Sequence, residues 1–169
     1  MTAIPVDDQD VATDTSLILN FLRIDRMDIL GALPGFRFAV LNHVIAEVTQ
    51  EPHRARLETA LTDGHVVEFE LTDLSAIADY NSLRENLGDG EAATIAAGAH
   101  EQWIIGMDEK ARAKREATDR VGEDNLLNTP GVLVYAVRVG VLTLEEAEQI
   151  RLDLADQNFA IKQLIADLV

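Results

Sequence analysis

The amino-acid sequence predicts an α/β fold: a three-layer α/β/α domain with a mostly parallel central sheet. Short apolar runs of strand length alternate along the chain with amphipathic segments of helical period, and this alternation is typical of a parallel sheet covered by helices. The clearest run is 103–107, which is apolar over most of its length, as expected of a strand buried on both faces. The segment before it, 91–99, is rich in alanine and predicts a helix that packs closely on the sheet.

The first part of the chain predicts strands that are each followed by a helix. Thr15 or Ser16 can cap the helix after the first strand, and Pro52 stops the helix that begins at Asn42. In the run 66–71, apolar residues alternate with two glutamates, which indicates a half-exposed strand at a sheet edge. The predicted strands are 11–13, 38–41 and 66–71, and the predicted helices cover 17–30, 42–48 and 57–61.

The second part of the chain contains clearer signals for helix starts. Thr72 or Asp73 can cap a helix that runs to about Asn86. Thr143 and Glu146 have the spacing of a capping box. Further predicted elements are helices that begin at 91, after 108 and at 129, strands at 103–107 and 126–127, and an amphipathic segment over 159–168.

The composition is that of an ordinary globular domain. The chain has 169 residues, of which 47% are hydrophobic and 26% are charged. We expect a flexible leader over residues 1–9 and a single domain over 10–169. No run approaches the roughly 20 apolar residues of a membrane span, and the first residues lack the basic and apolar regions of a signal peptide. The sequence has no cysteine, which suits a reducing compartment, so we expect a cytoplasmic protein.

The net charge of −16 argues against a protein that binds nucleic acid by bulk electrostatics, because phosphate affinity comes from Lys and Arg. It leaves open an enzyme that holds nucleic acid locally through a metal ion. Basic residues are concentrated between 110 and 120, directly after Asp108. They form either a solvated helix face paired with neighbouring acids or contacts with substrate phosphates.

Four acidic residues are expected to converge at one edge of the sheet. Asp14 and Asp108 follow predicted strands, and the carboxyl ends of parallel strands meet at the same edge. Glu47 lies on the helix after the second strand, and Glu91 begins the helix that leads towards Asp108. Converging carboxylates repel one another unless a cation such as Mg²⁺ or Mn²⁺, which prefers oxygen ligands, binds among them. Each acid taken alone could instead cap a helix or complement its dipole.

The order and spacing of these residues resemble a PIN domain, a family of metal-dependent ribonucleases. The chain is most similar to the stand-alone type related to VapC toxins, and the resemblance covers roughly residues 10–168. The motifs that carry it are, in chain order, Asp14-Thr-Ser, Glu47, Gly90-Glu91-Ala, Asp108-x-Lys-x-Arg112, Thr129-Pro-Gly-Val-Leu and a Gly140-Val-Leu-Thr turn.

The resemblance implies a role for each of these residues. Asp14, Glu47, Glu91 and Asp108 match the acidic metal site of the family, so it implies Mg²⁺ or Mn²⁺ as the cofactor and catalytic roles for all four acids. One departure is Met107, which stands where related proteins often have another acid. The residues expected to bind substrate are Ser16, Lys110 and Arg112.

The expected reaction is hydrolysis of RNA phosphodiester bonds by an endoribonuclease. Asp14, Glu91 and Asp108 are expected to hold the metal ion, and Glu47 to bind a second ion or orient the attacking water. The water attacks the phosphorus in line and the 3′-oxygen leaves. The resemblance further implies that the protein is the toxin of a toxin–antitoxin pair.

Two other functions compete with this hypothesis. The stronger one is a PIN-like fold that serves as a non-catalytic protein-interaction module, which the negative charge and Met107 favour. The other is a phosphatase or phosphotransferase with Asp14 as nucleophile. It is the weaker of the two, because Ser16 stands where the haloacid-dehalogenase type carries a second aspartate.

The expected partners of the ribonuclease follow from its charge. A net charge of −16 attracts a basic antitoxin protein, whose Arg or Lys side chains could pair with the site carboxylates. The edge strand 66–71 and the helix 17–30 are the expected apolar contacts for this partner. A homodimer is left open.

Overall fold

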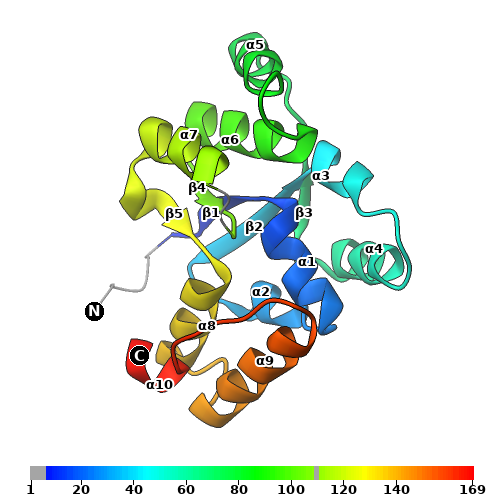
Figure 1. Cartoon of the computed structure of the whole chain (residues 1–169). Helices are drawn as coiled ribbons and strands as arrows, with labels where there is room; N and C mark the ends of the chain where they lie inside the picture. The colour runs from blue at the N-terminus through cyan, green and yellow to red at the C-terminus, as the bar shows by residue number, and fades with distance from the viewer. Residues whose placement is uncertain (1–6, 109–110) are drawn as a thin grey trace.

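The computed structural model describes residues 7–108 and 111–169, and its strands form one sheet in which all neighbours are parallel. The strand order is β3-β2-β1-β4-β5, so the first strand lies in the middle (Figure 1). This topology confirms the predicted α/β fold with a parallel sheet. The strands are β1 (Gln9–Thr13), β2 (Phe36–Leu41), β3 (Val67–Phe69), β4 (Ile104–Gly106) and β5 (Leu126–Leu127).

Helices cover both faces of this sheet (Figure 1). On one face, α6 (Asp89–Glu101) lies on β1, β2 and β4, while α7 (Ala111–Val121) lies on β4 and β5, and α5 (Leu74–Leu83) packs on α6. The other face carries α1 (Thr15–Arg23) and α2 (Asp28–Ala32). The remaining described elements are α3 (Asn42–Glu47), α4 (His53–Asp63), the short 3-10 helix η1 (Glu123–Asn125), α8 (Thr129–Arg138), α9 (Leu144–Asp156) and α10 (Ile165–Leu168).

The core is centred on β1 and α6. Val11 and Ala12 of β1 are fully buried, because parallel strands flank β1 on both sides and helices cover both of its faces. Gly98 lets α6 approach the sheet closely: a Cβ atom there would lie 2.3 Å from Cγ1 of Ile105 in β4. The small residues of α6 therefore set its distance from the sheet.

The segment predicted as one helix over 17–30 is two helices, α1 and α2. Asp25, in the turn between them, has a φ of 54°, a left-handed conformation that ends a helix. The cap of α1 also differs from the prediction of Thr15 or Ser16. The structure places Asp14 at the N-cap, with its side chain accepting the Ser16 N–H, as short acidic side chains commonly do.

The edge strand β3 is shorter than the predicted strand 66–71, although it does lie at the edge of the sheet. The predicted alternation holds for Phe69 and Leu71 but not at the start of the run, where Val66 is buried and Val67 is 37% exposed. The half-buried Phe69 packs edge-on against Trp103, with ring centroids 4.7 Å apart. A short acidic edge strand of this kind offers few free backbone groups for pairing with another chain.

Both ends of the chain differ from expectation as well. β1 begins at Gln9, within the leader predicted over 1–9, and residues 1–6 of that leader lie outside the described part of the chain. The amphipathic segment predicted over 159–168 is helical only in α10. In the two described ranges, we find no helix that is both long enough and apolar enough to cross a membrane.

Candidate functional site

The carboxyl ends of β1 and β4 place Asp14 and Asp108 at the same edge of the sheet. In the parallel register Thr13 pairs with Gly106, and the Asp14 N–H donates to the Gly106 carbonyl at 2.7 Å. Asp14 directly follows β1, and Asp108 lies two residues beyond β4. The predicted convergence of these two aspartates therefore follows from the pairing of two adjacent strands.

A single hydroxyl group, that of Ser16, connects the two aspartates. The Ser16 Oγ donates to Oδ2 of Asp14 at 2.6 Å and accepts the backbone N–H of Asp108 at 3.0 Å. Oδ2 of Asp14 also accepts the Ser16 N–H at 3.3 Å. Ser16, predicted to bind substrate, is thus hydrogen-bonded between the two acidic segments in this structure.

The Asp108 carboxylate is held by two buried polar residues, Asn20 and Thr129, to which the sequence assigned no role in the site. Asn20 Nδ2 donates to Oδ2 of Asp108 at 2.9 Å. The Thr129 N–H donates to Oδ1 at 2.9 Å, and the Thr129 hydroxyl donates to Oδ2. Asn20 and Thr129 are 1% and 0% exposed. A signal for Asn20 was present in the sequence, because it is a polar residue within the apolar stripe of α1.

Burial raises the pKa of both Asp14 and Asp108 above the ordinary value of 3.8. The charge of Glu91 raises the pKa of Asp14 further, and the charge of Asp14 does the same for Asp108, while hydrogen bonds from Ser16 and Thr129 lower them. Oδ1 of Asp14 is buried and has no hydrogen-bond partner among the described residues. A buried, unpartnered carboxylate oxygen with an acidic neighbour is suited to a cation.

The two candidate glutamates contact the N-terminus of α6. Oε1 of Glu47 accepts the Gly90 N–H at 2.8 Å, and its other oxygen accepts the hydroxyl of Thr15. Oε2 of Glu91 accepts the N–H of the N-cap residue Gly88 at 3.3 Å, which is one of the two bonds of a capping box, since glycine has no side chain to form the other. The absence of a side chain at Gly90 allows this close contact, because a Cβ atom would lie 2.5 Å from Oε2 of Glu47 and the Glu47 carboxylate would have to shift.

The segment 14–16 is where the candidate acids meet. Asp14 belongs to this segment, Thr15 binds Glu47, Ser16 binds the backbone of Asp108, and the charge of Glu91 acts on Asp14. The first turn of α1 thus relates all four predicted acids to one another. This arrangement can concentrate negative charge at the sheet edge, as a site for a divalent cation requires.

The donor chemistry of the site fits a hard divalent cation, but the ligand set is incomplete. Asp14 and Asp108 supply oxygen donors, and Oδ1 of Asp14 is unpartnered. Within the ranges that the structure describes, however, no three His, Cys, Asp or Glu residues form a group that could hold a metal ion. Glu47 and Glu91 are bonded to backbone N–H groups of α6 instead. The two aspartates therefore form the part of the candidate site that is already arranged.

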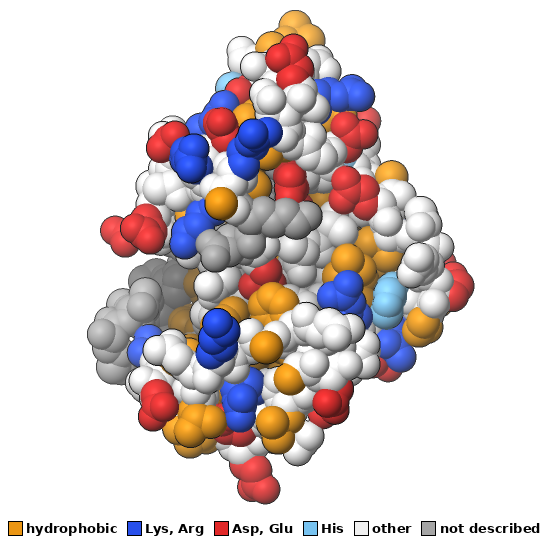
Figure 2. Space-filling view, in the orientation of Figure 1, with side chains coloured by type: hydrophobic (Ala, Val, Ile, Leu, Met, Phe, Trp, Pro, Cys, Tyr) orange, Lys and Arg blue, Asp and Glu red, His pale blue; other side chains and the backbone are white. Residues whose placement is uncertain are grey.

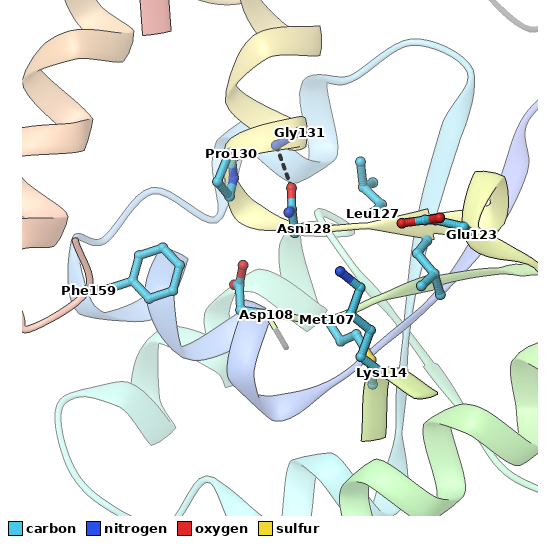
Figure 3. A pocket seen from close by; sticks show the side chains of 10 residues that line it. Met107, Asp108, Lys114, Glu123, Leu127, Asn128, Pro130, Gly131 and Phe159 are labelled. Atoms are coloured by element: carbon cyan, nitrogen blue, oxygen red, sulfur yellow. Dashed lines mark hydrogen bonds between the residues drawn. The ribbon is translucent and has the colours of Figure 1, made fainter. Parts of the chain in front are cut away.

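The structure describes one of the two basic residues that were predicted to bind substrate. Lys110 falls outside the described residues. Arg112 is exposed in the first turn of α7 and donates to the Asn86 carbonyl at 3.4 Å. Lys114, two residues further along, lines a cavity of about 530 Å³ together with Asp108 (Figure 3). Of the four candidate acids, Asp108 is the one that lines this cavity.

Together, the parallel sheet and the two aspartates at adjacent strand ends define an α/β domain with an acidic candidate site. A family model described as "DUF3368: PIN domain" matches residues 10–168. The chain therefore belongs to the PIN domain family, which gives it a fold of the nuclease type and implies binding of nucleic acid. Domains of this family are generally hydrolases that use divalent metals. None of the curated proteins and none of the solved structures compared with the chain matched it.

Proposed function

We propose that this protein is a metal-dependent endoribonuclease that hydrolyses RNA phosphodiester bonds. The observation that supports this proposal best is the linked pair of aspartates: the buried Asp14 and the half-buried Asp108 lie at adjacent strand ends and are joined through Ser16, and Oδ1 of Asp14 has no partner among the described residues. Structural acids usually have basic partners or complete hydrogen bonding. Within the described ranges, Asp14 has neither on its Oδ1 atom, so a ligand-binding role accounts for it better than a structural one.

In this proposal each polar residue of the site has a distinct role. Asp14, Glu91 and Asp108 would hold Mg²⁺ or Mn²⁺, and Glu47 would hold a second ion or orient the attacking water. A bound divalent cation lowers the pKa of water and neutralises charge that develops on a phosphodiester. Lys110 and Arg112 would contact substrate phosphates.

Three further residues would position the acids rather than touch the substrate. Ser16 fixes the spacing between Asp14 and the Asp108 backbone, and Asn20 and Thr129 orient the Asp108 carboxylate. Hydrogen bonds of this kind hold a ligand in place before the ion arrives. Ser16 was predicted to bind substrate, and we now propose that it positions the acids.

The proposed biological role is that of the toxin in a cytoplasmic toxin–antitoxin pair, formed by a single domain over 10–169. The excess of 30 acidic over 14 basic residues favours a basic antitoxin, because opposite charges steer association. Glu68 and Glu70 are exposed at the edge strand β3 and would face such a partner. A homodimer would be detected by the elution volume of the purified protein.

RNA cleavage tests the enzymatic proposal. Purified protein with Mn²⁺ or Mg²⁺ should cut a single-stranded RNA, and both EDTA and the Asp14→Asn variant should abolish the cleavage. Asp63→Asn, at an exposed position of α4, is the matched control and should leave it unchanged. Cleavage that persists in Asp14→Asn would indicate a contaminating nuclease and would contradict the proposal.

Controlled expression tests the toxin role separately. The native protein should arrest growth of a bacterial host, and Asp14→Asn should relieve the arrest. If both proteins arrest growth equally, the effect does not come from catalysis. Purification from the native host at low and at high salt tests the antitoxin: a basic protein should co-purify at low salt and dissociate at high salt. Recovery of the lone, active protein at both salt concentrations would contradict the antitoxin proposal.

The second candidate function is a non-catalytic interaction module. The hydrogen bonds of Glu47 and Glu91 to α6 favour it, because they account for both glutamates without a metal ion. Met107, buried where related proteins often have an acid, favours it as well. Melting temperature separates the two functions: millimolar Mn²⁺ should raise it in a metal-dependent nuclease by mass action, whereas an interaction module should melt at the same temperature with and without Mn²⁺.

A further inference from the structure

A groove runs from Asp108 along the N-terminal end of α8 towards the end of the chain. Two adjoining cavities of about 530 and 700 Å³ form it, and they share Asn128, Pro130, Gly131 and Phe159 as a common wall. Volumes in this range suit one or a few nucleotides or other small ligands. We call this feature the Phe159 groove. The residues that matter for the argument are Asp108, Lys114, Asn128, Pro130, Phe159 and Lys162.

Phe159 is placed in the groove by the way α9 ends. Asn158 has a φ of 64°; its N–H donates to the Ala155 carbonyl at 3.1 Å, and the Phe159 N–H donates to the Leu154 carbonyl at 2.9 Å. These bonds form a Schellman motif with Asn158 in the left-handed position, which asparagine tolerates well. The backbone of Phe159 is therefore fixed, while its ring is half-buried and lines both cavities.

The ring of Phe159 lies beside the candidate catalytic edge. In Figure 3 it stands on one side of the cavity, with Pro130 next to it, the Asp108 carboxylate in the middle and the Lys114 amine on the opposite side. A nucleotide can use both the Phe159 ring and the Lys114 amine next to the candidate metal ligand Asp108. The base stacks on the ring, and the phosphates lie near the positive charge.

The charge balance of the groove is opposite to that of the whole chain. Its walls carry Lys114, Arg138 and Lys162 against Asp108 and Glu123, whereas the chain has 14 basic and 30 acidic residues. Figure 2 shows basic and hydrophobic side chains over the region of α8 and α10, with acidic side chains among them. A groove whose walls carry more basic than acidic residues, on an otherwise acidic protein, can attract a polyanion.

We propose that the Phe159 groove binds single-stranded RNA next to the scissile phosphate, with one base stacked on Phe159. This inference rests on the proposed ribonuclease function and adds to it a subsite in which Phe159 stacks on one base of the substrate. Stacking on a half-exposed ring requires an unpaired base, so double-stranded RNA does not fit. Lys162 and Lys114 lie in the two adjoining cavities and can contact phosphates on either side of the stacked nucleotide.

The test uses the full chain and a fluorescein-labelled RNA hexamer in EDTA, where metal-dependent cleavage is absent. Phe159→Ala should weaken binding about tenfold, the effect of losing one stacked base, and Phe159→Trp should retain it. Leu152→Ala, a 49% exposed leucine of α9 outside the groove, is the matched control and should bind like the native protein. Thermal unfolding of each variant confirms that it is folded.

A hexamer of abasic sugars separates stacking from phosphate contacts. The abasic hexamer should bind weakly to the native protein, and Phe159→Ala should not reduce its affinity further. Lys162→Gln should reduce the affinity for both hexamers. Equal affinity of native protein and Phe159→Ala for the normal hexamer would overturn the proposal. So would a partner protein from the host that binds the native chain but not Phe159→Ala while RNA binding is unaffected, because the groove would then dock protein.

The cleavage assay with Mn²⁺ keeps this inference distinct from the proposed function. If the native protein cleaves RNA but Phe159→Ala binds and cleaves equally well, the groove proposal is wrong and the ribonuclease proposal stands. If the hexamer binds in a Phe159-dependent manner but Mn²⁺ gives no cleavage, the ribonuclease proposal is wrong and the groove still binds single strands.

Discussion

The two halves of the candidate site are built differently. The aspartate half, Asp14 and Asp108, is attached to adjacent strand ends and is tied together by the Ser16 hydroxyl. The glutamate half, Glu47 and Glu91, is attached to the ends of helices and bonds to backbone N–H groups of α6. Both aspartates have a raised pKa because of burial. Glu47 is exposed and Glu91 is half-buried.

This difference indicates which half of the site has a fixed geometry and which half can rearrange. Hydrogen bonds from Ser16, Asn20 and Thr129 restrict the aspartate side chains, so their geometry is set when the protein folds. The glutamates have longer side chains with more rotamer freedom, and their present hydrogen bonds stabilise α6. A cation that recruits Glu91 would have to replace the bond to Gly88, so we expect the glutamate half to move and the aspartate half to stay in place.

The largest expected effect contrasts one residue from each half. Asp108→Ala should lower the free energy of unfolding by about 2 kcal/mol, because it leaves the buried N–H groups of Asn20 and Thr129 without their acceptor. Glu47→Ala removes an exposed side chain that accepts one backbone N–H, that of Gly90, and should cost less than about 1 kcal/mol. Urea denaturation measures both. An equal or larger cost for Glu47→Ala would contradict the claim that the aspartate half is the more rigid one.

The pH dependence of stability tests the burial of Asp14. Its pKa is raised in the folded state, so the native protein retains a proton that the unfolded chain has released, and stability falls as the pH rises from about 4 through the raised pKa. The Asp14→Asn variant has no carboxyl group to deprotonate at this position, so its stability does not fall for this reason. Its stability relative to native protein should therefore increase between about pH 4 and pH 7 in EDTA. Asp63→Asn corrects for the removal of one negative charge, and a parallel trend in both variants would contradict the prediction.

Two neighbouring hydroxyls offer a finer comparison, because Ser16 serves the aspartates and Thr15 serves Glu47. Ser16→Ala should cost about 1 kcal/mol of stability and reduce metal affinity about 10- to 100-fold, as loss of a positioning hydrogen bond does. Thr15→Ala should cost less than about 0.5 kcal/mol, because its partner is exposed. Chemical denaturation and Mn²⁺ binding measure the two quantities, and equal losses would mean that both halves are equally rigid.

The smallest expected effect is at Gly90. The added Cβ atom of Gly90→Ala would contact the flexible end of Glu47, which can rotate away, so stability should fall by less than about 0.5 kcal/mol. Gly98→Ala is the contrasting variant, because its Cβ atom would meet the buried Ile105 side chain and overpacking costs about 1–3 kcal/mol. If Gly90→Ala were as destabilising as Gly98→Ala, the Glu47 side chain would be as rigid as the core.

The sequence was sufficient to predict the parallel fold and the meeting of Asp14 and Asp108, because strand runs and strand ends have local signals. It was not sufficient for the contacts of the two glutamates. Whether Glu91 bonds to Gly88 or points to Asp14 depends on a rotamer, and rotamers have no sequence period. The roles of Asn20 and Thr129 depend on contacts between residues 109 positions apart.

Elements without a strong period were predicted least well. The break between α1 and α2 depends on the left-handed backbone of Asp25, and aspartate is a weak signal for that conformation compared with glycine. The position of Phe159 depends on a Schellman motif with asparagine in place of glycine, so the usual glycine signal was absent. The groove could not be predicted for the same reason.

The most direct test of the central claim, that the aspartate half is a metal site, is calorimetric titration of the protein with Mn²⁺. The native protein should show saturable binding, Asp14→Asn should abolish it, and Glu91→Gln should weaken it, because Glu91 is recruited only when it leaves Gly88. Glu58→Gln, an exposed acid of α4, should bind Mn²⁺ like the native protein. Absence of saturable binding by the native protein up to millimolar Mn²⁺ would contradict the claim, as would native-like binding by Asp14→Asn.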